Sequence, residues 1–88
     1  MEAENGKIVK VIAGHDKNLF MVITAVQGDF AFICDGRTRK LSSPKKKRLK
    51  HLRLTNTVIN TQGLTDKQLR KVIGEFTGNG KLTETEDP

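Results

Sequence analysis

The chain is short of several residue types that define common classes of protein. Its 88 residues include one cysteine, two prolines and four phenylalanines, with no tryptophan or tyrosine. The single cysteine, Cys34, excludes an internal disulfide, and nothing in the composition points to secretion. No apolar run approaches the roughly 18 residues of a membrane span, and the first residues lack the apolar core of a signal peptide. We therefore expect one small cytoplasmic domain, in which Cys34 is a buried hydrophobic side chain.

Residues that carry catalysis or bind metals are also sparse. His15, His51 and Cys34 lie far apart in the chain, with no spacing typical of a zinc site. His15 and Asp16 are neighbours, and adjacent side chains on a turn rarely form a working acid–base pair. The sequence therefore predicts a protein that is not an enzyme and that uses no cofactor or metal.

Acidic residues are absent from one long stretch. Residues 37–53 hold nine of the sixteen lysines and arginines and no acid, whereas residues 83–88 carry three of the ten acids. Such segregation, with a net charge of +6, is typical of a surface that faces a polyanion. Charge alone does not choose between nucleic acid, acidic lipid and solvent.

The first half of the chain predicts short β-strands. Residues 6–14 form a β-rich run that leads into a turn, where Asn18 suits a positive φ angle. Residues 19–26 are apolar on both alternating faces, which indicates a strand that is either central in a sheet or covered on both sides. Residues 30–34 form a third strand, and Asp35–Gly36 after it is a strong hairpin signal.

The basic stretch is expected to complete a sheet. Residues 37–41 suggest a fourth strand, charged enough to lie at an edge, that stops or turns at Pro44. The spacing of Leu49, Leu52 and Leu54 fits one tight helical turn followed by a fifth short strand. Five short strands with close turns indicate a small β-barrel or sandwich.

The last third of the chain changes its period. Leu69, Val72, Ile73 and Phe76 recur at helical spacing. Thr65 and Gln68 form a capping box, Leu64 can pack on Leu69, and the glycines at 78–80 end the helix. We expect this helix to cover part of the outer face of strand 19–26. The predicted organisation is a disordered start (1–5), a barrel (6–54), a linker (55–63), a helix (64–77) and a disordered acidic tail (78–88).

Two stretches carry a resemblance to a known family. "GKIVKVIAGHDKNLFMVITAV" resembles a KOW motif, an RNA-associated strand–turn–strand element built around a turn glycine that matches Gly14. "CDGRTRKLSSPKKKRLKHL" resembles small bacterial KOW-domain proteins, which are related to large-subunit ribosomal proteins of archaea and eukaryotes. The chain departs from that pattern at Asn18 and Leu19, where relatives often have glycine and a basic residue.

The resemblance implies a five-stranded SH3-like barrel that binds RNA, in or beside the ribosome. The expected fold class is mainly β, with a carboxy-terminal α-helix. The expected partners are structured RNA, above all ribosomal RNA, and ribosomal proteins, with no membrane partner and a monomeric free state. The expected RNA-binding residues are His15, Lys17, Asn18, Arg37, Arg39, Lys40, Lys45, Lys46, Lys47, Arg48, Lys50, His51 and Arg53.

The few aromatic residues limit what the protein can read in RNA. Phe30, Phe32 and Phe76 are expected in the core, and Phe20, at a turn exit, has a chance of exposure. Without an aromatic platform, recognition of single bases is less expected than recognition of backbone and shape.

Four other interpretations of the basic stretch stay open. The lysines could guard an edge strand against aggregation, or "PKKKR" could serve as a nuclear localisation signal. The domain could dock other proteins, as the carboxy-terminal domain of NusG-type elongation factors does. Association with an anionic membrane is a weaker possibility, because no basic amphipathic helix of sufficient size supports it.

Overall fold

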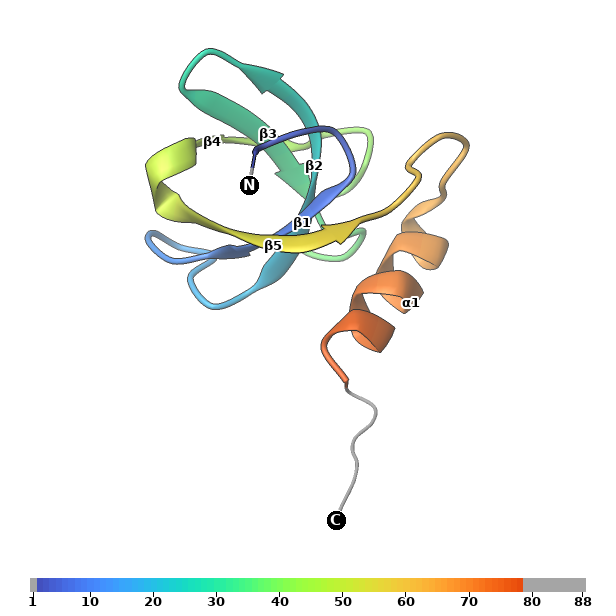
Figure 1. Cartoon of the computed structure of the whole chain (residues 1–88). Coiled ribbons are helices and arrows are strands. Elements are labelled where there is room, and N and C mark those ends of the chain that lie inside the picture. Colours follow the sequence, from blue (N-terminus) through green and yellow to red (C-terminus); the bar gives the residue numbers. More distant parts are fainter. Residues whose placement is uncertain (1, 79–88) are drawn as a thin grey trace.

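The computed structural model describes residues 2–78, and it is mainly β. One antiparallel sheet has five strands in the order β4-β3-β2-β1-β5, and one helix lies against it (Figure 1). The elements are β1 (Lys7–Val11), β2 (Phe20–Gln27), β3 (Phe30–Cys34), β4 (Lys45–Arg48), the short 3₁₀ helix η1 (Leu49–His51), β5 (Leu52–Val58) and α1 (Asp66–Phe76). The β-rich fold class with a carboxy-terminal helix is confirmed.

The main core lies on the concave side of the sheet, because alternate residues of each strand point there. Met21 and Ile23 of β2 pack with Ala31 and Ile33 of β3, and all four are fully buried. The other members of this cluster are Val9, Val11 and Leu52, with Ala3, Leu49 and Leu54 packed against it.

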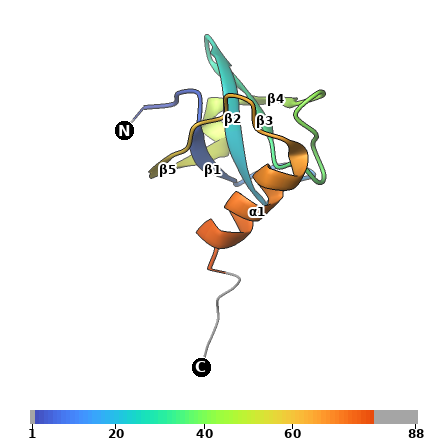
Figure 2. The same cartoon turned by 90° about the vertical axis from the view of Figure 1, so that its right-hand side faces the viewer.

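A second cluster joins the helix to the other side of the sheet. Val22 and Cys34 lie under Leu69 and Ile73 of α1, and Figure 2 shows the helix crossing that side near the start of β2. The prediction that strand 19–26 is covered on both faces is therefore confirmed only for its middle, around Val22, whereas Val26 is 42% exposed. Leu64 also packs against this cluster, beside Leu69 as expected.

The start of α1 is stabilised by the predicted capping box. Thr65 Oγ1 accepts a hydrogen bond from the Gln68 backbone N–H at 3.1 Å, and Gln68 Oε1 accepts one from the Thr65 N–H at 3.0 Å. These bonds satisfy two donors that the first helical turn would leave unpaired. Gly78 follows the helix with a positive φ of 73°, as expected of a helix end, whereas Asn79 and Gly80 lie outside the described residues.

The fourth strand is not where the sequence predicted it. Residues 37–41 form a loop, and β4 instead begins after Pro44, in the lysine run itself. Asp35 explains the difference, because its Oδ1 accepts the backbone N–H groups of Arg37 and Arg39, each at 2.9 Å. The backbone N–H groups of Arg37 and Arg39, which a strand would donate to β3, are used within this compact turn. The predicted hairpin at Asp35–Gly36 was therefore wrong.

Two predicted boundaries also shift. β5 continues to Val58, so residues 55–58 belong to the sheet and not to a linker. Near the amino terminus, Ala3 packs on the main core and Asn5 Oδ1 accepts a hydrogen bond from Thr61 at 2.9 Å. These residues, expected to be disordered, therefore contact the folded domain. Most of the predicted acidic tail (79–88) lies outside the described residues.

The sheet curls until its two edge strands are joined by η1. The Leu49 N–H donates to Asp29 O at 2.8 Å, and the Ile12 N–H donates to His51 O at 2.9 Å. The short helix is therefore held at one end by the β2–β3 turn and at the other by the β1–β2 turn. Among the described strands, β4 and β5 do not pair with each other, so the sheet remains unclosed.

Candidate nucleic-acid interface

The β1–β2 turn presents the first group of predicted RNA-binding residues. Gly14 and Asn18 both have positive φ angles, 92° and 78°, and the Asn18 N–H donates to Val11 O at 2.7 Å. Glycine and asparagine tolerate this conformation better than other residues, so the predicted role of Asn18 in the turn is confirmed. The turn leaves the side chains of His15, Lys17 and Asn18 exposed to solvent.

A salt bridge ties this turn to the loop after β3. Arg39 Nε donates to Asp16 Oδ2 at 2.8 Å, and the side chains are 29% and 6% exposed. The sequence predicted Arg39 as an RNA contact, but its Nε is already used within the protein. Asp16 was missed as a partner, because 23 residues separate the pair and no local pattern signals it.

The loop between β3 and β4 offers two further cations. Arg37 and Lys40 are exposed, and both lie on the turn that Asp35 organises. Cys34, just before this loop, is buried as predicted. Burial, followed by the nearby charges of Asp35 and Asp66, raises the pKa of Cys34 to about 11, so its thiol stays protonated at neutral pH.

The helix is anchored to the same loop. Arg70 donates to Gly36 O at 2.8 Å, and Asp66 Oδ1 accepts the Leu41 N–H at 2.8 Å. No local sequence pattern signals either contact, because the partners are 34 and 25 positions apart in the chain. These two bonds hold α1 against the 35–44 loop, and a pocket lies between them.

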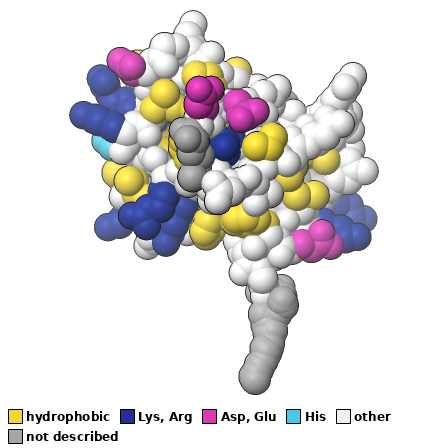
Figure 3. All heavy atoms as spheres, viewed as in Figure 1, with side chains coloured by type: hydrophobic (Ala, Val, Ile, Leu, Met, Phe, Trp, Pro, Cys, Tyr) yellow, Lys and Arg dark blue, Asp and Glu magenta, His cyan; other side chains and the backbone are white. Residues whose placement is uncertain are grey.

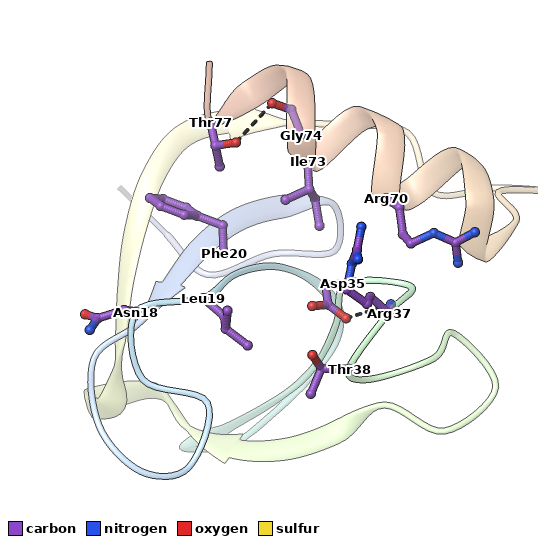
Figure 4. A pocket seen from close by; sticks show the side chains of 10 residues that line it. All are labelled: Asn18, Leu19, Phe20, Asp35, Arg37, Thr38, Arg70, Ile73, Gly74 and Thr77. Atoms are coloured by element: carbon purple, nitrogen blue, oxygen red, sulfur yellow. Dashed lines mark hydrogen bonds between the residues drawn. The ribbon is translucent and has the colours of Figure 1, made fainter. Parts of the chain in front are cut away.

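That pocket has a volume of about 480 Å³ and lies between α1, the β1–β2 turn and the loop (Figure 4). Leu19, Phe20 and Ile73 give it an apolar side, and Arg37 extends from the opposite side toward the helix (Figure 4). Its lining therefore combines a cation with a surface for a flat apolar group. The complete lining is Asn18, Leu19, Phe20, Asp35, Arg37, Thr38, Arg70, Ile73, Gly74 and Thr77.

β4 brings the lysine run next to the β1–β2 turn. Lys47 lies opposite Ala31 in the sheet, and its ammonium group reaches Gly14, so close that a Cβ at that glycine would collide with it. The two predicted halves of the interface, the turn and the basic segment, are thus in contact. Lys45 and Lys46 are exposed on this edge strand.

The alternate residues of β4 flank an aromatic ring. Lys46 Nζ lies 4.7 Å from the centre of the Phe30 ring, and the guanidinium carbon of Arg48 lies 5.0 Å from it. Phe30 and Phe32 were predicted to point into the core, but both are only half-buried. The core positions of β3 belong to Ala31 and Ile33 instead, because side chains alternate along a strand.

The last predicted residues lie on η1 and β5. Lys50 and Arg53 are exposed, whereas His51 is half-buried and its carbonyl is bonded to Ile12. Arg53 stands directly opposite Lys10, which is not among the predicted RNA-binding residues, and Lys10 in turn lies opposite Phe20. Lys10 Nζ is 5.9 Å from the Phe20 ring, and Phe76 packs on that ring with the centres 5.6 Å apart.

The basic side chains are unevenly distributed on the surface. Figure 3 shows several groups of lysine and arginine along the side of the sheet opposite α1, with hydrophobic side chains between them, and a further group over the helix. The contacts above connect the β1–β2 turn, the 35–44 loop and β4. The interface candidate therefore brings the β1–β2 turn next to a later part of the chain, the 35–44 loop with β4 directly after it, from which β2 and β3 separate it in the sequence.

Other kinds of site are not seen in residues 2–78. No group of three or more histidine, cysteine, aspartate or glutamate side chains is placed to hold a metal ion in that range. Within the same residues, no helix has the length and apolar character needed to cross a membrane. No protein-family model matches the chain, and no curated protein matches it significantly.

Proposed function

We propose that this chain is a non-catalytic RNA-binding protein that neutralises the phosphate backbone of structured RNA, with ribosomal RNA as the first candidate. The location that we propose for it is the cytoplasm, in association with the ribosome. The residues proposed to contact RNA are His15, Lys17, Asn18, Arg37, Lys40, Lys45, Lys46, Lys47, Arg48, Lys50, His51 and Arg53. Arg39 has an indirect role, because its bond to Asp16 holds the β1–β2 turn against the 35–44 loop.

The observation that carries this proposal is the contact between Lys47 and Gly14. It places the lysine run of β4 beside the exposed His15 and Lys17 of the β1–β2 turn. Cations collected on one surface release counterions together when they bind phosphates, and this supplies most of the non-specific affinity for nucleic acid. An edge strand that only resists aggregation would need one or two lysines and no neighbouring cations.

The proposal includes the SH3-like barrel of the KOW type. Its support is the strand order, with β4 and β5 at the edges, and η1, whose ends are bonded to Asp29 and Ile12. A barrel of this kind needs a short helical turn between the two edge strands of the curled sheet, and η1 joins β4 to β5 in this way. The positive φ of Gly14, at the position of the KOW turn glycine, agrees with this assignment.

The salt dependence of binding tests the phosphate mechanism. If four to six cations contact single-stranded segments of a ribosomal RNA fragment, log K should fall against log[salt] with a slope of roughly −3 to −4. Filter binding from low to moderate ionic strength measures this slope. A response that is flat with salt rules the mechanism out.

A matched pair of variants locates the surface. The double change Lys45→Glu and Lys46→Glu reverses two exposed charges on β4, and Lys67→Glu with Lys71→Glu makes the same change on the exposed side of α1. We expect the β4 variant to weaken binding to many RNA sequences about equally, because phosphate contacts carry no sequence information. The helix variant should lose much less, and equal losses would contradict the assigned surface.

Protein docking is the second candidate, and the pocket beside α1 favours it. The apolar side of this pocket is formed by Leu19, which is 38% exposed, together with Phe20 and Ile73. In this case the cations would only accelerate encounter. A pull-down with the intact chain discriminates the two functions, because RNase treatment should leave its partners unchanged if docking to protein is the activity.

A further inference from the structure

The corner where the β2–β3 turn meets η1 contains a second cavity. The Leu49 N–H donates to Asp29 O at 2.8 Å and closes this corner. The cavity has a volume of about 460 Å³ and is lined by Asp29, Arg48, Leu49 and Lys50. It lies at the far end of β2 from the pocket beside α1, and it is large enough to accept one nucleobase.

A guanidinium lines this cavity, and an aromatic ring lies against that guanidinium. Phe30 follows Asp29 in the chain and stands directly opposite Arg48 in the sheet. The guanidinium carbon of Arg48 is 5.0 Å from the Phe30 ring centre, so the ring orients the guanidinium that also lines the cavity. Planar guanidinium groups and aromatic rings are the surfaces on which proteins stack unpaired RNA bases.

A free carboxylate faces the same space. Asp29 is exposed, and within residues 2–78 its carboxylate takes part in no side-chain hydrogen bond or salt bridge, although Arg48 and Lys50 line the cavity with it. An ionised carboxylate only accepts hydrogen bonds and would repel a phosphate. In a protein whose cations attract RNA, the group that the Asp29 carboxylate can bind is therefore the edge of a base that carries hydrogen-bond donors.

Guanine is the base that fits this set of groups. Its Watson–Crick edge carries two adjacent donors, N1–H and the 2-amino group, which one carboxylate can accept together. Adenine, cytosine and uracil each offer a single donor position on that edge. Lys46 and Lys50 are exposed on either side of Arg48 and are placed for the flanking phosphates.

We propose that this corner binds an unpaired guanine of the RNA, with the base stacked on the Arg48 guanidinium and hydrogen-bonded to Asp29. The inference rests on the proposed RNA-binding function and adds a base preference to it. The planar surface that this corner uses is a guanidinium and not an aromatic platform, and Phe30 lies against that guanidinium. The site therefore reads one unpaired nucleotide within an RNA that is otherwise held by its backbone.

RNA hairpins with one bulged nucleotide test the base preference. Five hairpins of equal length and charge carry guanine, inosine, adenine, cytosine or uracil at the bulge, and fluorescence anisotropy measures the affinity of the intact chain for each. A bidentate base contact discriminates against the wrong base by about ten-fold or more, so the guanine hairpin should bind about ten-fold more tightly than the adenine hairpin. Inosine, which lacks the 2-amino group, should fall between them.

Two variants identify the groups responsible, and each is read from the guanine and adenine affinities and their ratio. Asp29→Asn should bring the ratio close to one. Its control, Glu75→Gln, removes one exposed negative charge from α1 and should leave the ratio as in the original chain. Arg48→Lys keeps the charge but loses the planar group, so the affinities for the guanine and adenine hairpins should both fall, with their ratio and the salt slope unchanged.

The outcomes separate this inference from the function on which it rests. Equal affinity for all five hairpins, with a steep salt slope, overturns the guanine site and leaves backbone binding intact. A guanine preference that survives in Asp29→Asn, with circular dichroism showing a folded protein, also overturns the site. Failure of every hairpin to bind at low salt overturns both the site and the RNA-binding function.

Discussion

Phe20 and Phe30 lie on the same face of the sheet, and each has a lysine over its ring, yet their surroundings differ. At the covered end (Lys10, Phe20 and Phe76), the helix supplies a second aromatic ring 5.6 Å away. At the open end (Phe30, Lys46 and Arg48), no second aromatic ring pairs with Phe30 among residues 2–78, and a second cation lies over the ring instead.

The comparison shows that an aromatic ring on the outer face of the sheet is covered by hydrophobic side chains where α1 lies over it, and by cations where α1 does not. At the covered end, the ring continues into the hydrophobic contacts around Val22 and Cys34, against which Phe20 packs. At the open end, Phe30 is half-buried and packs against neither of the two hydrophobic clusters. The covered end therefore contributes to stability, and the open end is the one that we propose for binding.

The largest expected effect comes from removing the helix side chain that is most deeply buried. Leu69→Ala should reduce the free energy of unfolding by about 2–5 kcal/mol, because Leu69 is fully buried and a cavity would remain. Urea unfolding followed by circular dichroism measures this loss. Val26→Thr, at a position on β2 that is 42% exposed, is the control and should change stability by no more than about 0.5 kcal/mol. A loss no greater than that of the control would contradict the assignment of the covered end to stability.

A smaller effect is expected from loosening the start of the helix. Thr65→Ala removes the acceptor of the Gln68 N–H and should cost about 1 kcal/mol of stability. Cys34 lies under α1 and its raised pKa keeps the thiol protonated, so alkylation of this thiol reports opening of the helix. At pH 8 the variant should be alkylated about five-fold faster than the original chain, since 1.4 kcal/mol corresponds to ten-fold in an opening equilibrium. An unchanged alkylation rate would mean that the helix does not protect this side of the sheet.

The smallest effect distinguishes the two lysines. Lys46→Gln at the open end should make the salt slope of RNA binding less steep by about 0.7, the contribution of one contact to a single-stranded phosphate. Lys10→Gln at the covered end should leave the slope as it is. Filter binding over the same salt series measures both. If Lys10→Gln changes the slope as much as Lys46→Gln does, the two ends share the RNA and the division between them is wrong.

The sequence predicted those elements of the fold whose signal lies within a few neighbouring residues. Thr65 and Gln68 marked the start of the helix because a capping box is made within four residues. The third strand had the predicted bounds, 30–34, but its faces were reversed. Every residue of that strand is apolar, so size suggested that the phenylalanines point inward. The choice was made by β4, whose Lys46 and Arg48 meet Phe32 and Phe30 across the sheet.

The interface itself depended on contacts that no local pattern contains. The sequence identified the basic segment and the β1–β2 turn, but it could not show that Lys47 reaches Gly14. It could not show either that Arg39 Nε donates to Asp16. Both contacts arise only when the sheet curls and brings distant turns together. The cavity at Asp29 was missed for the same reason, because η1 forms its other side.

The way η1 is attached has a consequence for how this surface can change. Its two ends are held by main-chain bonds, from Leu49 to Asp29 and from Ile12 to His51. Main-chain bonds do not depend on the side chain, except that proline cannot donate one, so exposed residues such as Arg48 and Lys50 can be exchanged while Leu49 stays packed on the main core. Over evolutionary time, or in a designed library, this corner could acquire a preference for another nucleotide while its backbone keeps one shape.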